Sequence, residues 1–363
     1  MVRMVELQRE IRLLKKEING ALNNVIERAQ FIEGPAVKEL EENIKVFLGV
    51  KHAITLRSGS DALFLALKAA NLDRNSEVIT TALSFIATAE AIIHAGVKPV
   101  FADIDYNTMN IDPRSIEKNI NNKTKALIVV HIFGNPCKID EISEIAKKHH
   151  LFLIEDCAQS FGSTFNNQFL GTFGDCGCFS FFPTKNLGCY GDGGLIITNN
   201  DTLAEHIKIL KNHGSIKKYE HLKVGFNSRL DSIQAAILNI KLQYVNTWNK
   251  IRQEIANKYI KTLPPNIGFQ QLYKGAEHIY HQFTIRYINR LHLMNHLNAQ
   301  NIESAIYYPI PIHKQKAFQD LHINALLPKT EKLTQEVLSI PIHPYLKDWE
   351  IEHIIKAINS FKG

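Results

Sequence analysis

The sequence predicts an α/β fold in which a mostly parallel, mixed sheet is flanked by helices, with a smaller C-terminal α+β part. Three observations lead to this prediction. Short apolar runs without polar alternation are separated by segments of helical periodicity, which is the pattern of parallel strands buried on both faces. The polar and glycine-rich motifs follow these runs, where open parallel sheets bind ligands. The chain of 363 residues suits one large and one small domain, and we expect them over residues 1–240 and 241–363.

The first elements in chain order are two helices. Apolar residues recur every three or four positions over residues 4–29, which predicts an amphipathic helix. A second helix is predicted from Pro35 to Phe47, because proline is favoured in the first turn. Both helices belong to the predicted large domain.

Strands and helices then alternate. Strands are predicted at His52–Leu56, Val78–Thr80, Pro99–Phe101, Ala126–Val130, Leu151–Ile154, Cys178–Phe182 and Leu195–Thr198. Helices are predicted between them at 61–70, 84–95, 112–119, 138–149 and 201–211.

The last third of the chain has a different pattern. One long helix is predicted over 228–262, and Leu263-Pro264-Pro265 ends it. Alternation predicts a strand over His278–Tyr287, and helices are expected over Leu291–Ala299 and 349–361. This succession of elements indicates the smaller α+β domain.

Composition narrows the function classes. The net charge is +6, but the basic residues are scattered, which argues against nucleic-acid binding. We expect no membrane segment, since no apolar run reaches 18 residues. The five cysteines and the absence of a signal-peptide pattern predict free thiols in the cytoplasm. No metal is expected, because the histidines lack metal-site spacing.

Lys185 is the most informative single residue. It ends an apolar run, Ser180-Phe181-Phe182-Pro183-Thr184, just before a glycine-rich turn. A partly desolvated lysine loses its proton more easily and can form a Schiff base with an aldehyde. Asp156 ends another apolar run, and an aspartate so placed can hold a pyridinium proton. The pair predicts pyridoxal 5′-phosphate as cofactor, although Asp156 taken alone would also suit a helix cap.

Other motif residues fit the same cofactor but have ordinary alternatives. Gly59 and Ser60 could bind a phosphate at a helix N-terminus, or Ser60 could be a plain cap. Phe85 could stack on a heterocycle or pack in the core. Gln159 could bond the ring hydroxyl, and Ser180 would point to the phosphate side if its segment is a strand.

Taken together, the motifs resemble the sugar-nucleotide aminotransferases of the DegT/DnrJ/EryC1/StrS family over nearly the whole chain. The segments that carry the resemblance are Ser58–Leu63, Ser84–Glu90, Val100–Asp105, Glu155–Ser160, Ser180–Lys185, Gly191–Gly194, Gly225–Asp231 and Tyr308–His313.

The resemblance implies a homodimer of the fold-type-I class of pyridoxal phosphate enzymes, with active sites shared between the subunits. Lys185 would bind the cofactor covalently and move protons, and Asp156 would pair with the ring nitrogen. The remaining cofactor contacts would come from Gly59, Ser60, Phe85, Gln159, Ser180 and, from the partner subunit, Asn227. The substrate contacts would come from Arg229 of the partner and from Tyr307, Tyr308 and His313.

The expected reaction transfers the amino group of L-glutamate to a nucleotide-linked keto sugar and releases 2-oxoglutarate. The stretch Asn227-Ser228-Arg229-Leu230-Asp231 resembles relatives that aminate C-3. The stretches Phe181–Gly194 and Tyr308–Pro311 resemble enzymes that make 3-amino sugars for lipopolysaccharide O-antigen or S-layer glycan. A UDP-linked 3-keto-N-acetylhexosaminuronate and a dTDP-linked 3-keto-6-deoxyhexose both stay open as substrates. The alternatives are C-4 amination, a sugar dehydratase of the same family, a pyridoxal phosphate enzyme of another reaction class, and a regulator without activity. Lys185 argues against the dehydratase, which has histidine there.

Overall fold

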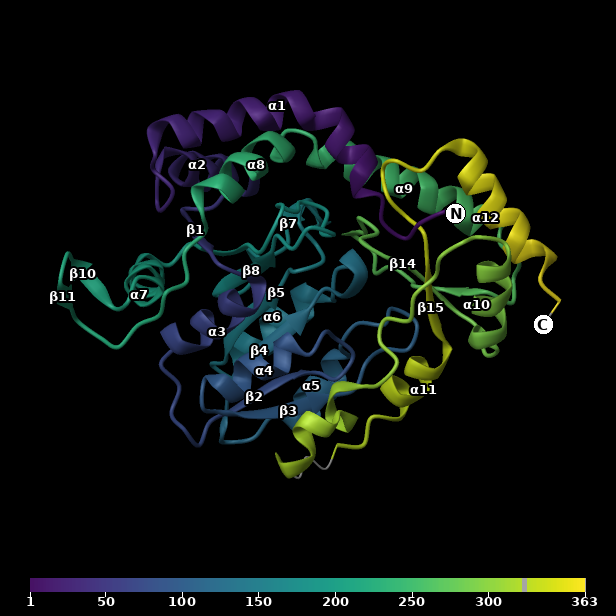
Figure 1. Ribbon diagram of the computed structural model, residues 1–363. Coiled ribbons are helices and arrows are strands. Elements are labelled where there is room, and N and C mark those ends of the chain that lie inside the picture. Colours follow the sequence, from purple (N-terminus) through teal and green to yellow (C-terminus); the bar gives the residue numbers. More distant parts are fainter. Residues whose placement is uncertain (322–324, 363) are drawn as a thin grey trace.

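A seven-stranded sheet forms the centre of the molecule. The computed structural model describes residues 1–321 and 325–362 (Figure 1). Across the sheet the strand order is β1 (His52–Leu56), β9 (Gly194–Thr198), β8 (Cys176–Ser180), β5 (Phe152–Asp156), β4 (Thr124–Val130), β2 (Glu77–Thr81) and β3 (Lys98–Ala102). β9 runs antiparallel to both of its neighbours, β1 and β8, and the other neighbouring strands of this sheet pair in parallel. The mostly parallel, mixed sheet expected from the sequence is therefore confirmed.

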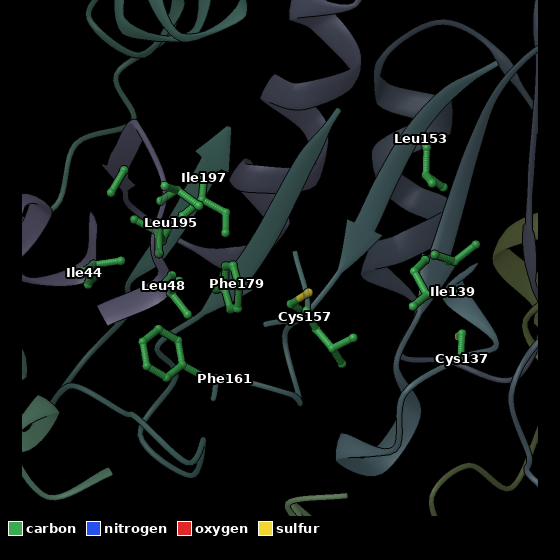
Figure 2. Packing of buried hydrophobic residues seen from close by; sticks show 14 of the residues in the cluster. Ile44, Leu48, Cys137, Ile139, Leu153, Cys157, Phe161, Phe179, Leu195 and Ile197 are labelled. Carbon is green, nitrogen blue, oxygen red and sulfur yellow. The ribbon is translucent and has the colours of Figure 1, made fainter. Parts of the chain in front are cut away.

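Helices cover both faces of this sheet. Successive strand residues point to opposite sides, so each strand can contribute to a buried cluster on either face. On β5, for example, Leu153 belongs to one buried cluster and Ile154 to the other. The cluster around Leu153 packs against α2 (Pro35–Leu48), α5 (Pro113–Asn119), α6 (Ile139–Lys148) and α8 (Ser232–Leu242), as Figure 2 shows in part. The cluster around Ile154 packs against α3 (Gly59–Ala69), α4 (Ala87–His94) and α7 (Asp201–Lys211).

A smaller antiparallel sheet lies beside the large one, near both chain termini (Figure 1). Its three strands are β12 (Gly268–Phe269), β14 (Phe283–Arg286) and β15 (Val337–Ile340). Its core includes residues of α9 (Val245–Thr262), α10 (Arg290–Ala299) and α12 (Asp348–Ser360). Val2 joins this core, so the N-terminus packs with the C-terminal part. The domain boundary at residue 240 stays a prediction.

Several shorter elements complete the fold. α1 (Leu7–Arg28) packs on α8, and α11 (Pro328–Glu336) precedes β15. A second small sheet holds β13 (Ala276–Glu277), β6 (Thr164–Phe165) and β7 (Gln168–Phe169), and 3-10 turns occur at Ile132–Gly134, Ile312–Lys314 and Lys316–Leu321. Within the described residues, no helix combines the length and apolar character needed to cross a membrane.

The prediction of one long helix over 228–262 is wrong, because α8 and α9 are separate helices with Gln243 and Tyr244 between them. Both residues keep nearly helical dihedral angles, with φ −63° and −101°. Neither is glycine or proline, so the sequence gives no signal for the break.

The strand predicted over His278–Tyr287 is also too long, and only Phe283–Arg286 pairs as β14. The reason is Tyr280, whose φ of 48° is incompatible with an extended strand.

Strand β8 ends at Ser180 rather than at Phe182, because its pairing with β9 stops at Gly194. Lys185 therefore lies in a turn beyond the sheet. A hairpin of β10 (Ser215–Lys217) and β11 (Glu220–His221), which the sequence pattern did not predict, projects from the body beside α7 (Figure 1).

Candidate active site

A cavity of about 580 Å³ lies where the carboxyl ends of several parallel strands meet. Its walls come from the segments that follow β1, β2, β4, β5 and β8. Of the residues singled out from the sequence, the cavity is lined by Gly59, Ser60, Phe85, Asp156, Gln159, Ser180, Lys185, Tyr307 and Tyr308. Residues far apart in the chain thus share one space.

Lys185 and Asp156 both line this cavity. Part of the Lys185 side chain opens onto it, but the surrounding protein displaces water from the amine. This burial lowers the pKa of Lys185 to about 8, and the nearby Asp156 carboxylate opposes the shift. A lysine with such a pKa is partly unprotonated near neutral pH and can act as a nucleophile.

Asp156 is 4% exposed at the end of β5. Burial raises the pKa of its carboxyl, while hydrogen bonds from Thr88 and Ala158 lower it. The Thr88 hydroxyl donates to Oδ2 at 2.8 Å, and the Ala158 N–H donates to Oδ1 at 3.1 Å. These donors favour the ionised carboxylate, the form that can pair with a protonated ring nitrogen.

The N-terminus of α3 forms a second wall. Ser58, not Ser60, caps this helix, because its Oγ accepts the N–H of Asp61 at 3.1 Å. The Ser60 side chain is therefore left for the cavity, beside the unpaired N–H groups of the first helical turn. Gly59 is needed here, since a Cβ would lie 2.7 Å from the Cβ of Ser180. Two serines and a helix N-terminus make a site suited to a phosphate.

Aromatic and amide side chains form the remaining walls. Phe85 lies in the turn before α4 and is 56% exposed, with its ring centroid 6.4 Å from that of Tyr308. Gln159 accepts the N–H of Phe133 at 2.7 Å and donates to the Tyr308 hydroxyl at 3.2 Å. One hydrogen of the Gln159 amide has no protein partner in the described part of the chain.

Three predicted residues do not line this cavity in the single chain: Asn227, Arg229 and His313. Arg229 donates to Asn212 at 3.1 Å, near the base of the β10–β11 hairpin. His313 bonds Glu331 at 3.2 Å. Their proposed roles stay predictions, as do those of the lining residues.

Thr88, His281 and Gln282 line the cavity but received no role from the sequence. Thr88 stands within the Ser84–Glu90 motif, where its hydroxyl could have been noticed. His281 gives no such signal, because only the fold brings it to the cavity.

One group in the described structure has the composition of a metal site: His131, Glu155 and Cys157. The ligand atoms of His131 and Glu155 are already used in hydrogen bonds. His131 Nδ1 accepts the N–H of Cys137 at 3.0 Å, so its Nε2 carries the hydrogen and donates to Glu155. Glu155 also accepts three backbone N–H groups, from Gly171, Phe173 and Gly174. The group therefore works as a buried hydrogen-bond network.

The donor set fits pyridoxal 5′-phosphate. Gly59, Ser60 and Ser180 would hold its phosphate, and Asp156 would pair with its ring nitrogen. Lys185 offers the amine for its aldehyde. The close approach of Gly59 to Ser180 and the support of Asp156 by Thr88 are observations of this chain that favour the fit.

Comparisons with known proteins agree with this interpretation. The sequence profile of the DegT/DnrJ/EryC1/StrS aminotransferase family matches residues 12–359. A relative from Geobacillus stearothermophilus, named a pleiotropic regulatory protein, is 43% identical over 99% of this chain and 98% of its own. The dTDP-3-amino-3,6-dideoxy-alpha-D-galactopyranose transaminase of Aneurinibacillus thermoaerophilus is 41% identical over 99% of both chains.

Two further similarities extend the comparison. The UDP-2-acetamido-2-deoxy-3-oxo-D-glucuronate aminotransferase of Pseudomonas aeruginosa is 38% identical over 99% of this chain and 100% of its own. The X-ray structure of DesV from S. venezuelae, in complex with a ketimine intermediate, superimposes with a TM-score of 0.96. It is 34% identical and the match covers 99% of this chain and 97% of DesV.

Proposed function

The chain belongs to the DegT/DnrJ/EryC1/StrS aminotransferase family, and from this premise we propose that it transfers the amino group of L-glutamate to C-3 of a nucleotide-linked keto sugar. Aminotransferases of this family depend on pyridoxal 5′-phosphate. When bound, that cofactor supplies an aldehyde that carries the amino group and a ring that accepts electrons. The observation that carries the proposal is the meeting of Lys185 and Asp156 in one cavity.

Lys185 supplies the nucleophile and the proton carrier. Its amine, with a pKa of about 8, can release and take up a proton near neutral pH. Once free, the same Nζ can take a proton from one bound group and return it to another.

As a carboxylate, Asp156 would pair with the positive charge of the protonated ring nitrogen. Thr88 and Ala158 fix the orientation of the carboxylate through their two hydrogen bonds. The N–H groups of α3 and the Ser60 and Ser180 hydroxyls would anchor the phosphate on the other side. Phe85 would cover one face of the ring between them.

The position of amination rests on relatives and on one motif. The Aneurinibacillus relative is named for a 3-amino sugar and the Pseudomonas relative for a 3-oxo sugar. The segment Asn227–Asp231 resembles that of relatives that aminate C-3. A dTDP-linked 3-keto-6-deoxyhexose and a UDP-linked 3-keto-N-acetylhexosaminuronate are the two candidate substrates, for O-antigen, lipopolysaccharide or S-layer glycan.

A homodimer is part of the proposal. Asn227 and Arg229 would complete the active site of the partner subunit. The projecting hairpin and the segment after it support this, since they expose apolar side chains that a second subunit can cover: Tyr219 in the hairpin is 86% exposed and Val224 after it is 92% exposed. The five buried, unpaired cysteines support a cytoplasmic location.

The name of the Geobacillus relative gives a specific reason to keep a second candidate, a regulatory protein. The presence of Lys185 and its supported Asp156 favours catalysis instead. Glutamate-dependent release of 2-oxoglutarate by the purified protein separates the two, because a regulator would release none.

The proposal is tested with 3-keto and 4-keto sugars linked to UDP or dTDP, each incubated with L-glutamate. We expect an amino sugar from a 3-keto substrate, and NMR of the product locates the new amine at C-3. The Lys185→Ala variant is the control and should give no product. Amination at C-4 alone, or product formation by the variant, would contradict the proposal.

A further inference from the structure

His281 lines the cavity together with Lys185, and three buried hydrogen bonds determine which of its ring nitrogens carries the hydrogen. His281 Nδ1 lies 3.0 Å from Asn186 Oδ1. Asn186 Nδ2 lies 2.7 Å from Asn249 Oδ1. Asn249 Nδ2 lies 3.1 Å from the carbonyl oxygen of Phe161. His281, Asn186 and Asn249 are each 5% exposed.

The direction of these bonds follows from their last member. The carbonyl of Phe161 can only accept, so the amide group of Asn249 that faces it must be the nitrogen. Asn249 then presents its oxygen to Asn186, which must donate. Asn186 in turn presents its own oxygen to His281, and Nδ1 of His281 must carry the hydrogen.

The imidazole of His281 is neutral. Burial lowers its pKa well below the ordinary value, and the cations of Lys185 and Arg252 lower it further. A neutral ring with a hydrogen on Nδ1 has a lone pair on Nε2. This Nε2 has no hydrogen-bond partner in the described part of the chain. It is therefore the ring atom that can accept a hydrogen bond from a molecule in the cavity.

Two other buried histidines have the opposite arrangement. His278 Nδ1 accepts the N–H of Tyr280 at 2.9 Å, which leaves the hydrogen on Nε2, bonded to Gln270 at 3.1 Å. His131 Nδ1 accepts the N–H of Cys137 in the same way. The lone pair on Nε2 is therefore set by the neighbours of His281 and is not shared by these two buried histidines.

We propose that His281 is a specificity residue for the sugar: its Nε2 accepts a hydrogen bond from a hydroxyl of the keto sugar beside Lys185. Asn186 and Asn249 are positioning residues that keep the acceptor in place. A fixed acceptor favours a substrate with a donor at this point and disfavours one with a carbonyl or no polar group there. This assignment goes beyond the amination reaction and rests on the proposed function.

The arrangement of hydrogens can be tested without any substrate. In the protein labelled with ¹⁵N-histidine, long-range ¹H–¹⁵N spectra distinguish a ring nitrogen that carries a hydrogen from one that does not. We expect the hydrogen on Nδ1 for His281 and on Nε2 for His278 and His131. The His281 signals are assigned by their loss in His281→Phe or, if that variant does not fold, by their shift in Asn249→Leu. A hydrogen on Nε2 of His281 would overturn the inference, whatever the reaction of the protein.

The role toward the sugar is tested by measuring the two half reactions separately. In His281→Phe we expect kcat/KM for the keto sugar to fall about 10- to 100-fold, as for loss of one buried hydrogen bond. The half reaction with L-glutamate should change less than about twofold. Asn249→Leu should lower kcat/KM for the keto sugar to a smaller degree. Its spectrum should show a mixture of His281 rings with the hydrogen on Nδ1 and on Nε2.

His278→Phe is the matched control, because it removes a buried histidine that does not line the cavity. It should leave both half reactions unchanged at temperatures where the variant is folded. Equal losses in both half reactions of His281→Phe would contradict recognition of the sugar. Absence of amination by the unaltered protein would instead refute the proposed function, while the ring form of His281 would still be measurable.

Discussion

The hydroxyl of Thr88 lies 2.8 Å from Oδ2 of Asp156 and donates a hydrogen bond to this buried carboxylate. Thr88 Oγ1 also lies 2.9 Å from Ser84 Oγ. Because Thr88 has one hydroxyl hydrogen and uses it on Asp156, Ser84 must be the donor in that second contact. Two hydroxyls in series thus support the charge on Asp156, and such chains strengthen each bond.

Removing the Thr88 hydroxyl should weaken catalysis. In Thr88→Val the carboxylate loses one of its two donors, so its ionised form becomes less favourable. We expect the rate of both half reactions to fall about tenfold, equivalent to about 1.4 kcal/mol. Stopped-flow measurements check this, with Thr88→Ser as the control that keeps the hydroxyl. Equal rates in the two variants would show that the hydroxyl is unimportant.

Asp156 should lower the stability of the protein without cofactor at neutral pH. Its pKa is raised above the ordinary value of 3.8. At a pH between the ordinary pKa, which applies to the unfolded chain, and the raised pKa of the folded protein, the folded protein binds more protons than the unfolded chain. The contribution of Asp156 to stability is therefore lost as the pH rises.

Asp156→Asn should therefore be more stable than the unaltered protein at pH 7, by about 0.5–2 kcal/mol, and inactive as a transaminase. Urea unfolding of both cofactor-free proteins measures the difference. The gain should shrink when the pH is lowered toward the ordinary pKa of aspartate. A variant that is less stable at pH 7 would rule out this explanation.

The reactivity of Lys185 should rise at lower pH than that of an ordinary lysine. Burial lowers its pKa from 10.5 to about 8, so the amine loses its proton as the pH passes about 8. Reductive alkylation of the cofactor-free protein, followed by mass spectrometry of the Lys185 peptide, should show a midpoint near that value. In Asp156→Asn the midpoint should move lower, since the carboxylate that favours the ammonium form is gone. A midpoint near 10.5 would mean that the amine is fully solvated.

A buried ion pair links the N-terminal helix to the main body. Lys241 on α8 is 1% exposed, and its Nζ lies 2.7 Å from Oε1 of Glu10 on α1. Lys241 also donates to the carbonyl of Gly188, three residues after Lys185. This pair therefore joins α1 to the segment that carries the reactive lysine.

Lys241→Met should destabilise the protein by about 3–5 kcal/mol, because it leaves Glu10 buried without its partner. The double variant with Glu10→Gln should recover part of this loss, since no unpaired charge remains. Urea unfolding of the two variants gives the comparison. If the single and double variants are equally stable, the ion pair contributes nothing specific.

The fold could be predicted from the sequence where the apolar pattern was long and regular. The seven strands of the large sheet and most of its helices follow from buried apolar runs such as that of β5. Tertiary effects decided the rest. A positive φ at Tyr280 shortened β14, and a turn without glycine or proline separated α8 from α9.

The residues of the cavity could likewise be predicted only in part. Lys185 and Asp156 stand in local motifs whose chemistry can be read directly. His281 could not be found in this way, because its meaning depends on Asn186 and Asn249, which lie in distant parts of the chain. Thr88 lies between these cases: its motif was visible, but its partner 68 residues away was not.

The covalent attachment of the cofactor to Lys185 is tested most directly by reducing the protein loaded with pyridoxal 5′-phosphate with borohydride and mapping its peptides by mass spectrometry. We predict one stable pyridoxyl group, on the Nζ of Lys185, and none in Lys185→Ala. Attachment to a different lysine, or no attachment in a protein that still transfers amino groups, would contradict the account.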